Sequence, residues 1–160
     1  MPIKVGERLP EAKFRVMTPE GPAWKTTDDI FKGKKVALFA VPGAFTSTCH
    51  KTHVPSIVEN AAALKAKGVN TIAVTSVNDV FVMDAWQKAS GAANVEFLAD
   101  GNGDFAKAVD LAFDASGNGL GTRSRRYAML VEDGVVKMLN IEEAPGKVEI
   151  SGGGALLKQL

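Results

Sequence analysis

Two short apolar runs, separated by one helical segment, constrain the fold of this chain most strongly. Residues 35–41 (KVALFAV) and 70–76 (NTIAVTS) are almost continuously apolar, as are strands buried on both faces of a sheet. The segment between them, residues 55–68, spaces its apolar side chains at helical intervals and ends at Gly68, as helices often do. A strand, a helix and a second parallel strand form a right-handed crossover, so the chain is predicted to be an α/β protein.

The rest of the chain adds elements of both kinds. We expect two further helices at residues 78–91 and 103–113, a strand at residues 95–100, and a C-terminal helix at residues 152–160. Asn78 or Asp79 suits the N-cap of the first of these helices. Asp133-Gly134 suits a type I′ hairpin turn between two apolar runs, and a smaller hairpin is expected through residues 19–21. This order predicts a mixed central β-sheet flanked by α-helices.

Length and charge narrow the class of protein. The 160 residues fit a single domain, residues 1–160, without repeats or low-complexity linkers. The net charge of +1 gives no field that attracts nucleic acid or an anionic membrane, and no apolar run approaches the roughly 20 residues of a membrane span. The first residues also lack the apolar core of a signal peptide, so we expect a cytoplasmic protein with no nucleic-acid or membrane partner.

Cys49 is the only cysteine, which excludes an intramolecular disulfide and a C-x-x-C motif. One interpretation is a small core residue, because free cysteine is among the most buried residue types. The alternative is a reactive thiol. Cys49 follows a predicted strand and a Pro42-Gly43 turn and precedes a predicted helix, so it is expected in a first helical turn, among polar neighbours. Unpaired N–H groups and the helix dipole favour an anion there.

A reactive thiol at this position also needs a cation. An unperturbed thiol, with a pKa of about 8.5, is only about 3% ionised at pH 7. A helix N-terminus contributes about 0.3–1 kcal/mol, which is less than one pKa unit. The candidate cations are His50, His53 and the basic cluster at residues 123–126, whose alternative interpretation is a solvated loop.

The spacing of Pro42, Thr46 and Cys49 resembles the active-site signature of the peroxiredoxins. In that signature a proline is followed four residues later by Thr or Ser, and three residues after that by the reactive cysteine. Most of the chain is similar to the subgroup typified by mammalian peroxiredoxin 5 and plant type II enzymes, through residues 42–69, 76–86, 97–111 and 125–142. The resemblance implies a thioredoxin-like fold and a thiol peroxidase.

The resemblance also implies roles for individual residues. The family arginine directly precedes an aromatic residue, a place that Arg126 occupies and that Arg123 and Arg125 do not. We expect the Thr46 hydroxyl to accept a hydrogen bond from the peroxide and to donate one to the thiolate, and Arg126 to stabilise the charge on sulfur and oxygen. In the substrate pocket, three further contributions are expected: shielding of the sulfur by Pro42, backbone N–H donation at Thr48, and contact with the Leu120 side chain.

A second reactive cysteine is missing from the C-terminal part, where Ser151 is only the nearest polar residue. We therefore expect a one-cysteine cycle on hydrogen peroxide and small alkyl hydroperoxides, in which an external thiol, glutathione with glutaredoxin or thioredoxin, reduces a Cys49 sulfenic acid. No metal or organic cofactor is expected. The resemblance further implies a homodimer, with Phe45, Phe81 and Trp86 as candidate interface residues or, equally, ordinary core residues.

Some features depart from the family pattern or allow other interpretations. Ser47 replaces a frequent proline, His50 receives no role, and His53 either supports the pocket or is structural. Cys49 and His53 have ligand-like spacing, but one cysteine and two crowded histidines make a poor zinc site. The alternative function is a thioredoxin-like redox sensor or chaperone, in which oxidation of Cys49 is a signal without turnover.

Overall fold

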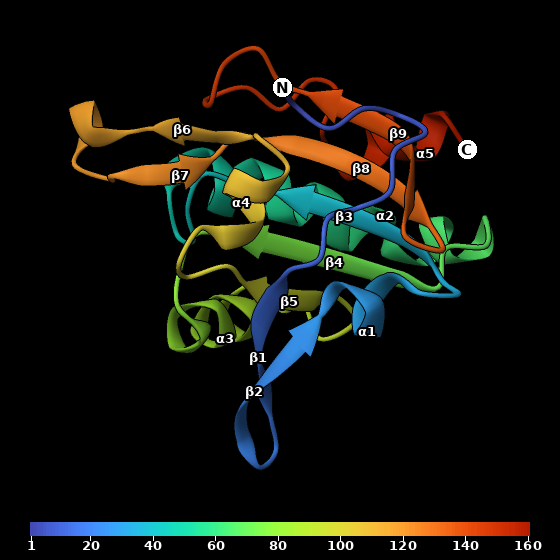
Figure 1. The fold of residues 1–160 in the computed structure, drawn as a ribbon, viewed down its shortest axis with the longest axis horizontal. Helices are drawn as coiled ribbons and strands as arrows, with labels where there is room; N and C mark the ends of the chain where they lie inside the picture. The colour runs from blue at the N-terminus through green and yellow to red at the C-terminus, as the bar shows by residue number, and fades with distance from the viewer.

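The two apolar runs form adjacent parallel strands at the centre of a seven-stranded sheet. In the computed structural model, which describes residues 1–160, β3 (Lys35–Ala40) pairs in parallel with β4 (Thr71–Ser76) (Figure 1). On one side β5 (Glu96–Ala99) continues the parallel set, and on the other β8 (Tyr127–Glu132) pairs antiparallel with β3. The strand order is β2-β1-β5-β4-β3-β8-β9. The predicted mixed central sheet is confirmed.

Both predicted hairpins are present, one at each edge of the sheet. β8 and β9 (Val135–Ile141) are joined through Asp133 and Gly134, whose φ angles of 48° and 79° are both positive, as a type I′ turn requires. At the opposite edge, β1 (Lys13–Thr18) pairs antiparallel with β2 (Gly21–Thr26). Each hairpin therefore forms one edge of the sheet.

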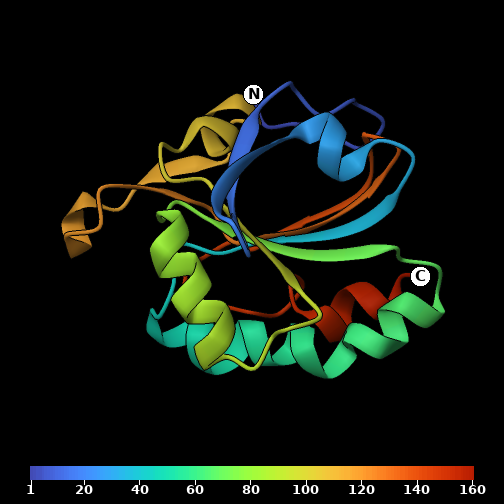
Figure 2. The same cartoon turned by 90° about the horizontal axis from the view of Figure 1, so that it is seen from below.

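Helices cover both faces of the sheet. Figure 2 shows α2 (Val54–Ala66), α3 (Val80–Ala89) and α5 (Gly153–Lys158) on one face, and the short helices α1 (Thr27–Phe31) and α4 (Asp104–Ala108) on the other. Each face has its own apolar core. The core under the first group includes Ile57, Leu64, Met83 and Trp86, and the other includes Phe14, Phe31, Phe105 and Leu111.

The prediction of a helix over residues 103–113 is wrong in its second half. α4 ends at Ala108, and Asp110 has a φ of 56°, which a right-handed helix does not allow. Residues beyond it form β6 (Ala112–Asp114), which pairs with β7 (Thr122–Ser124) in a two-stranded ribbon that extends from the body of the protein (Figure 1). α4 ends in a hydrogen-bonded turn, in which the N–H groups of Asp110 and Leu111 donate to the Lys107 and Ala106 carbonyls.

The predicted helix α3 and the unpredicted helix α1 both begin with a side-chain N-cap. Asp79 is the N-cap of α3, where its carboxylate accepts a hydrogen bond from the Val82 N–H. α1 begins with a capping box, because Thr26 and Asp29 each accept a hydrogen bond from the backbone N–H of the other. The Thr26-to-Asp29 spacing was thus a helix-start signal that the sequence contained.

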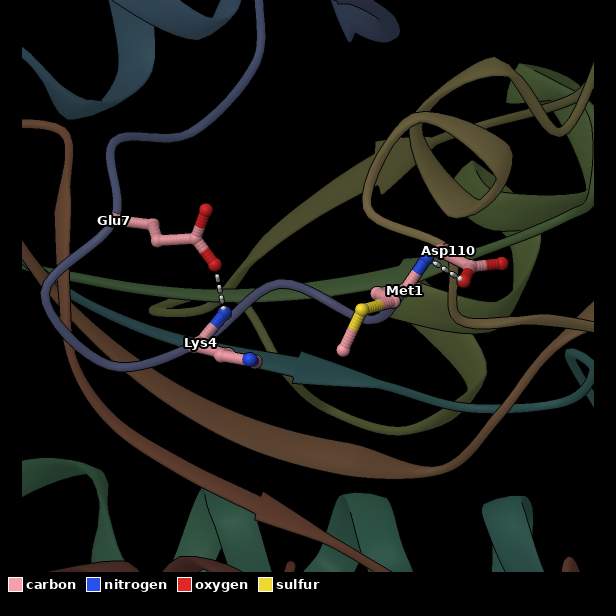
Figure 3. Close-up of polar contacts among 4 residues, drawn as sticks. All are labelled: Met1, Lys4, Glu7 and Asp110. Carbon is pink, nitrogen blue, oxygen red and sulfur yellow. Dashed lines mark hydrogen bonds and ion pairs between the residues drawn. The ribbon is translucent and has the colours of Figure 1, made fainter.

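The N-terminal segment is held to β9 by backbone hydrogen bonds, in which the Gly6 N–H donates to the Val136 carbonyl and the Val136 N–H donates to the Glu7 carbonyl. The Met1 amino group lies 2.8 Å from the Asp110 carboxylate, and the Lys4 N–H donates to the Glu7 carboxylate at 2.9 Å (Figure 3). Met1 and Asp110 are both well exposed, so their ion pair contributes little to stability. None of the helices is long and apolar enough to cross a membrane.

We expect Gly153→Ala to destabilise the fold because α5 begins in close contact with α2. A Cβ at Gly153 would lie 2.6 Å from the Ser56 carbonyl oxygen and 3.0 Å from the Ile57 Cα, both of them backbone atoms. Such overpacking costs about 1–3 kcal/mol of unfolding free energy, to be measured by urea denaturation. Gly154→Ala is the matched control, since its Cβ would approach nothing closer than 3.6 Å. Equal stabilities of the two variants would contradict this account.

Candidate active site

Cys49 lies where the chain turns from the end of β3 into the helix layer. The helix starts at Ser47, and residues Cys49–His53 form a π-helical turn before α2, with the Val54 N–H donating to the Cys49 carbonyl. The predicted position in a first helical turn is confirmed. An i, i+4 pair is nearly aligned in a π turn, and the side chains of Cys49 and His53 are both fully buried.

Arg126 approaches Cys49 from the strand beside β3. Tyr127, the first residue of β8, pairs with Ala40 at the end of β3, so Arg126 is brought to the same edge of the sheet as the cysteine loop. Arg126 is 2% exposed, and its Nη2 donates to Cys49 Sγ at 3.2 Å. Nη1 lies 2.8 Å from His53 Nδ1, and Nε donates to the Pro145 carbonyl at 3.0 Å. All three nitrogens are engaged, which fixes the guanidinium in one orientation.

His53 is neutral in this arrangement. Its Nε2 lies 2.7 Å from the Ser151 carbonyl, which can only accept, so Nε2 carries the proton. Nδ1 is therefore the acceptor for Arg126. Burial, together with the nearby Arg126 charge, lowers the pKa of His53 to about 4. Of the candidate cations, only the charged Arg126 donates a hydrogen bond to the Cys49 sulfur. The neutral His53 helps to orient Arg126 by accepting a hydrogen bond from it.

Three hydrogen-bond acceptors that hold Arg126, His53 or the Ser151 segment in place carried little or no signal in the sequence. The Pro145 and Ser151 carbonyls belong to the main chain, which looks alike at every position of a sequence. The Glu142 carboxylate, which organises the Ser151 segment, sits in a loop without a recognisable motif. His53 alone was visible, through its spacing of four residues from Cys49.

The Thr46 hydroxyl differs from expectation in one contact. It donates to the Gly43 carbonyl at 2.7 Å, so its proton is used to close the turn instead of lying on the Cys49 sulfur. The oxygen lone pairs stay able to accept a hydrogen bond from a substrate. Its expected role as an acceptor from peroxide stays a prediction.

The expected pocket residues lie in two segments. Pro42 lies two residues after the end of β3, and the Thr48 hydroxyl donates to the Gly146 carbonyl at 3.4 Å. The Thr48 N–H belongs to the first helical turn, where N–H groups lack intrahelical partners. Leu120 is in the β6–β7 loop, where its carbonyl accepts from Arg123 Nε at 2.9 Å. The substrate contacts of all three residues stay predictions.

An aromatic cluster adjoins the cysteine turn. The Trp86 indole N–H donates to His50 Nδ1 at 2.9 Å, and the Phe45 ring lies 5.6 Å from the His50 ring. Trp86 is fully buried and stacks edge-on against Phe97, so its expectation as an interface residue is wrong and it is a core residue. Phe45 and Phe81, by contrast, are 47% and 66% exposed.

Gly43 is required where Arg123 packs on the cysteine loop. A Cβ there would lie 2.9 Å from Thr46 Cγ2 and 3.2 Å from Arg123 Nη1, which also donates to the Val77 carbonyl. Gly43→Ala is therefore expected to displace Thr46 and to slow oxidation of Cys49 by hydrogen peroxide roughly tenfold, measured by stopped flow. Gly117→Ala, where a Cβ would meet nothing within 4 Å, serves as control. A Gly43→Ala rate equal to that of the control would exclude this role of Gly43.

The fold and site together define a thiol-dependent oxidoreductase with a thioredoxin-like arrangement. A thiol at a helix N-terminus, in contact with a guanidinium, is arranged to react as a thiolate. Its burial keeps the charge of Arg126 effective, because there is little water to screen it.

The chain belongs to the Redoxin family, which it matches over residues 4–157. It is 46% identical over 164 residues to rice (Oryza sativa) peroxiredoxin-2E-2, chloroplastic, covering 99% of this chain and 72% of the relative. It is also 46% identical to rice peroxiredoxin-2C, covering 99% of both chains. The crystal structure of reduced Prx3 from Vibrio vulnificus, in complex with hydrogen peroxide, superimposes with a TM-score of 0.94 at 47% identity and 98% coverage of both chains. The predicted peroxiredoxin family, thioredoxin-like fold and thiol peroxidase activity are confirmed.

Proposed function

We propose that this peroxiredoxin reduces hydrogen peroxide and small alkyl hydroperoxides by a one-cysteine cycle at Cys49. The Cys49 thiolate attacks the terminal oxygen of the hydroperoxide, and the S–O bond forms as the O–O bond breaks. The sulfur is oxidised to sulfenic acid, and the departing oxygen takes one proton and leaves as water or an alcohol. The proposal is carried by one observation, the 3.2 Å contact between Cys49 Sγ and Arg126 Nη2.

We further propose separate roles for the surrounding groups. Arg126 stabilises the thiolate and the charge that develops along the O–O bond, and the lone pairs of Thr46 Oγ1 accept a hydrogen bond from the hydroperoxide. The N–H groups of the first helical turn, including that of Thr48, add positive potential. Pro42 and Leu120 supply apolar contacts in the substrate pocket beside Cys49. Hydrogen peroxide as substrate is supported by the peroxide complex of the Vibrio vulnificus relative.

An external thiol completes the proposed cycle, without a metal or organic cofactor. Cys49 is the only cysteine, so the sulfenic acid has no intramolecular thiol partner. One external thiol condenses with the sulfenic acid to a mixed disulfide and releases water. A second thiol then displaces Cys49 and yields an external disulfide. Glutathione with glutaredoxin, or thioredoxin, supplies these thiols.

We also propose a homodimer and a cytoplasmic location. The dimer is supported by two large aromatic side chains left exposed, Phe45 in the cysteine turn and Phe81 on the first turn of α3. The reducing thiol pool of the cytoplasm suits a cycle that depends on external thiols. Sedimentation velocity and cell fractionation test the two points, and a monomer or an organellar protein would overturn them.

Intact-mass spectrometry tests the cycle directly. After one equivalent of hydrogen peroxide the chain should gain one oxygen atom at Cys49. Glutathione with glutaredoxin, or thioredoxin, should remove that oxygen, and the catalytic consumption of peroxide should follow the competent reductant. A chain that gains no oxygen would refute the proposal. Oxygen gain without turnover by either reductant would favour the redox-sensor alternative.

A further inference from the structure

The Glu142 carboxylate organises the loop that follows β9. Its Oε2 accepts hydrogen bonds from the N–H groups of Glu149, Ile150 and Ser151, each at 2.8 Å, and from the Ser151 hydroxyl at 2.6 Å. Glu142 is buried, yet it has no cationic side chain among these partners. Three successive N–H groups converging on one oxygen form a nest for the anion. The carboxylate therefore fixes the course of residues 149–151.

The same loop supplies one acceptor of Arg126 directly and holds a second one, His53, in place. The Pro145 carbonyl accepts from Nε, and the Ser151 carbonyl holds the N–H of His53, whose Nδ1 accepts from Nη1. The Glu142 N–H donates to the Arg126 carbonyl at 3.0 Å, so the start of the loop is tied to Arg126 as well. Two of the three contacts that orient the guanidinium thus depend on the loop, and the third is Cys49 itself.

We propose that Glu142 is a positioning residue for the peroxidatic centre. Its carboxylate folds residues 149–151 so that the Ser151 carbonyl selects the His53 tautomer that accepts from Arg126, and Arg126 is thereby aimed at the Cys49 sulfur. The inference rests on the proposed function of Cys49 and Arg126, and it adds a group that touches neither the sulfur nor the peroxide.

The protonation states of the chain are consistent with this role. Burial opposes ionisation of Glu142, but the hydrogen bonds from the Ser151 side chain and from the three backbone N–H groups outweigh it, so the pKa of Glu142 lies below its usual range. The pKa of His53, about 4, keeps its ring neutral at pH 7. Glu142 is therefore anionic and His53 is an acceptor throughout the physiological range.

The test compares Glu142→Gln with wild type in the full chain. Loss of the charge weakens the nest, so Arg126 loses its fixed orientation. The rate constant for Cys49 oxidation by hydrogen peroxide at pH 7 should fall roughly threefold to thirtyfold. The thiolate absorbance of Cys49 should also appear at higher pH, and raising the pH should recover part of the rate. Glu149→Gln removes the same charge from an exposed side chain in the same loop, and it should behave as wild type.

A second variant decides the question if Glu142→Gln does not fold. Ser151→Ala removes one of the four hydrogen bonds to Glu142 and keeps the carbonyl that holds His53, so its thiol titration should shift in the same direction by less. A folded Glu142→Gln with wild-type rate and titration, even if less stable, would overturn the inference, as would an unshifted Ser151→Ala titration in the absence of a folded Glu142→Gln. A wild type inert to peroxide would instead refute the proposed function.

Discussion

Cys49→Ser will consume no measurable hydrogen peroxide in the presence of either reductant. Serine fills nearly the same volume, and its oxygen is able to accept the hydrogen bond from Arg126, so the site is retained. A serine hydroxyl does not ionise near pH 7 and forms no sulfenic acid. Removing a catalytic nucleophile costs other enzymes at least about a thousandfold in turnover, and this chain has no second thiol to substitute.

The measurement is peroxide consumption coupled to reduced glutathione with glutaredoxin, and separately to thioredoxin. Circular dichroism and urea unfolding of Cys49→Ser provide the folding control, since a buried hydroxyl with a partner costs little stability. Turnover by the folded variant above the protein-free blank would remove Cys49 from the chemistry.

Arg126→Gln will slow Cys49 oxidation by roughly a hundredfold. Loss of one preorganised donor to a developing charge typically costs about 10²–10³ in rate, and this guanidinium also carries the charge that favours the thiolate. The thiolate absorbance should appear at higher pH than in wild type. Arg126→Lys keeps the charge but lacks the planar fork that reaches Cys49, His53 and Pro145 together, so its rate should be intermediate.

Stopped-flow oxidation across pH separates the two contributions of Arg126. If the arginine acted only on ionisation, the Arg126→Gln rate at high pH would reach that of wild type; a remaining deficit measures stabilisation of the transition state. Arg125→Gln, next in the chain, is the control, because Arg125 has no contact with Cys49 and reaches only the Glu142 carbonyl at 3.5 Å. Equal rates for both arginine variants would exclude the special role of Arg126.

The sheet was predictable wherever the signal was local. The strand, helix and strand around Cys49, the Asp133-Gly134 turn and the Asp79 cap each follow from a few neighbouring residues. The helix prediction over residues 103–113 failed because its apolar residues fit two periods, and the positive φ at Asp110 belongs to the hydrogen-bonded turn that ends α4. The β6–β7 ribbon is two short strands of three residues, too short to show alternation.

The residues of the site were easier to predict from the sequence than the hydrogen bonds between them. Pro42, Thr46 and Cys49 were identified by spacing, and Arg126 by its place before Tyr127. The sequence did not indicate that the Thr46 proton goes to Gly43, that Trp86 is buried beneath His50, or that main-chain carbonyls hold Arg126 and His53. Such bonds depend on backbone atoms, which every residue carries and no motif distinguishes.

The complete burial of Cys49 sets how the cycle responds to its two reactants. A hydroperoxide is a small molecule, whereas the thiol of the proposed glutaredoxin or thioredoxin reductant is carried by a folded protein. The Cys49–His53 turn must therefore open before the oxidised sulfur is reduced. Because every turnover includes that opening, its rate is the upper limit of turnover, and turnover saturates at that limit with both reductant and peroxide.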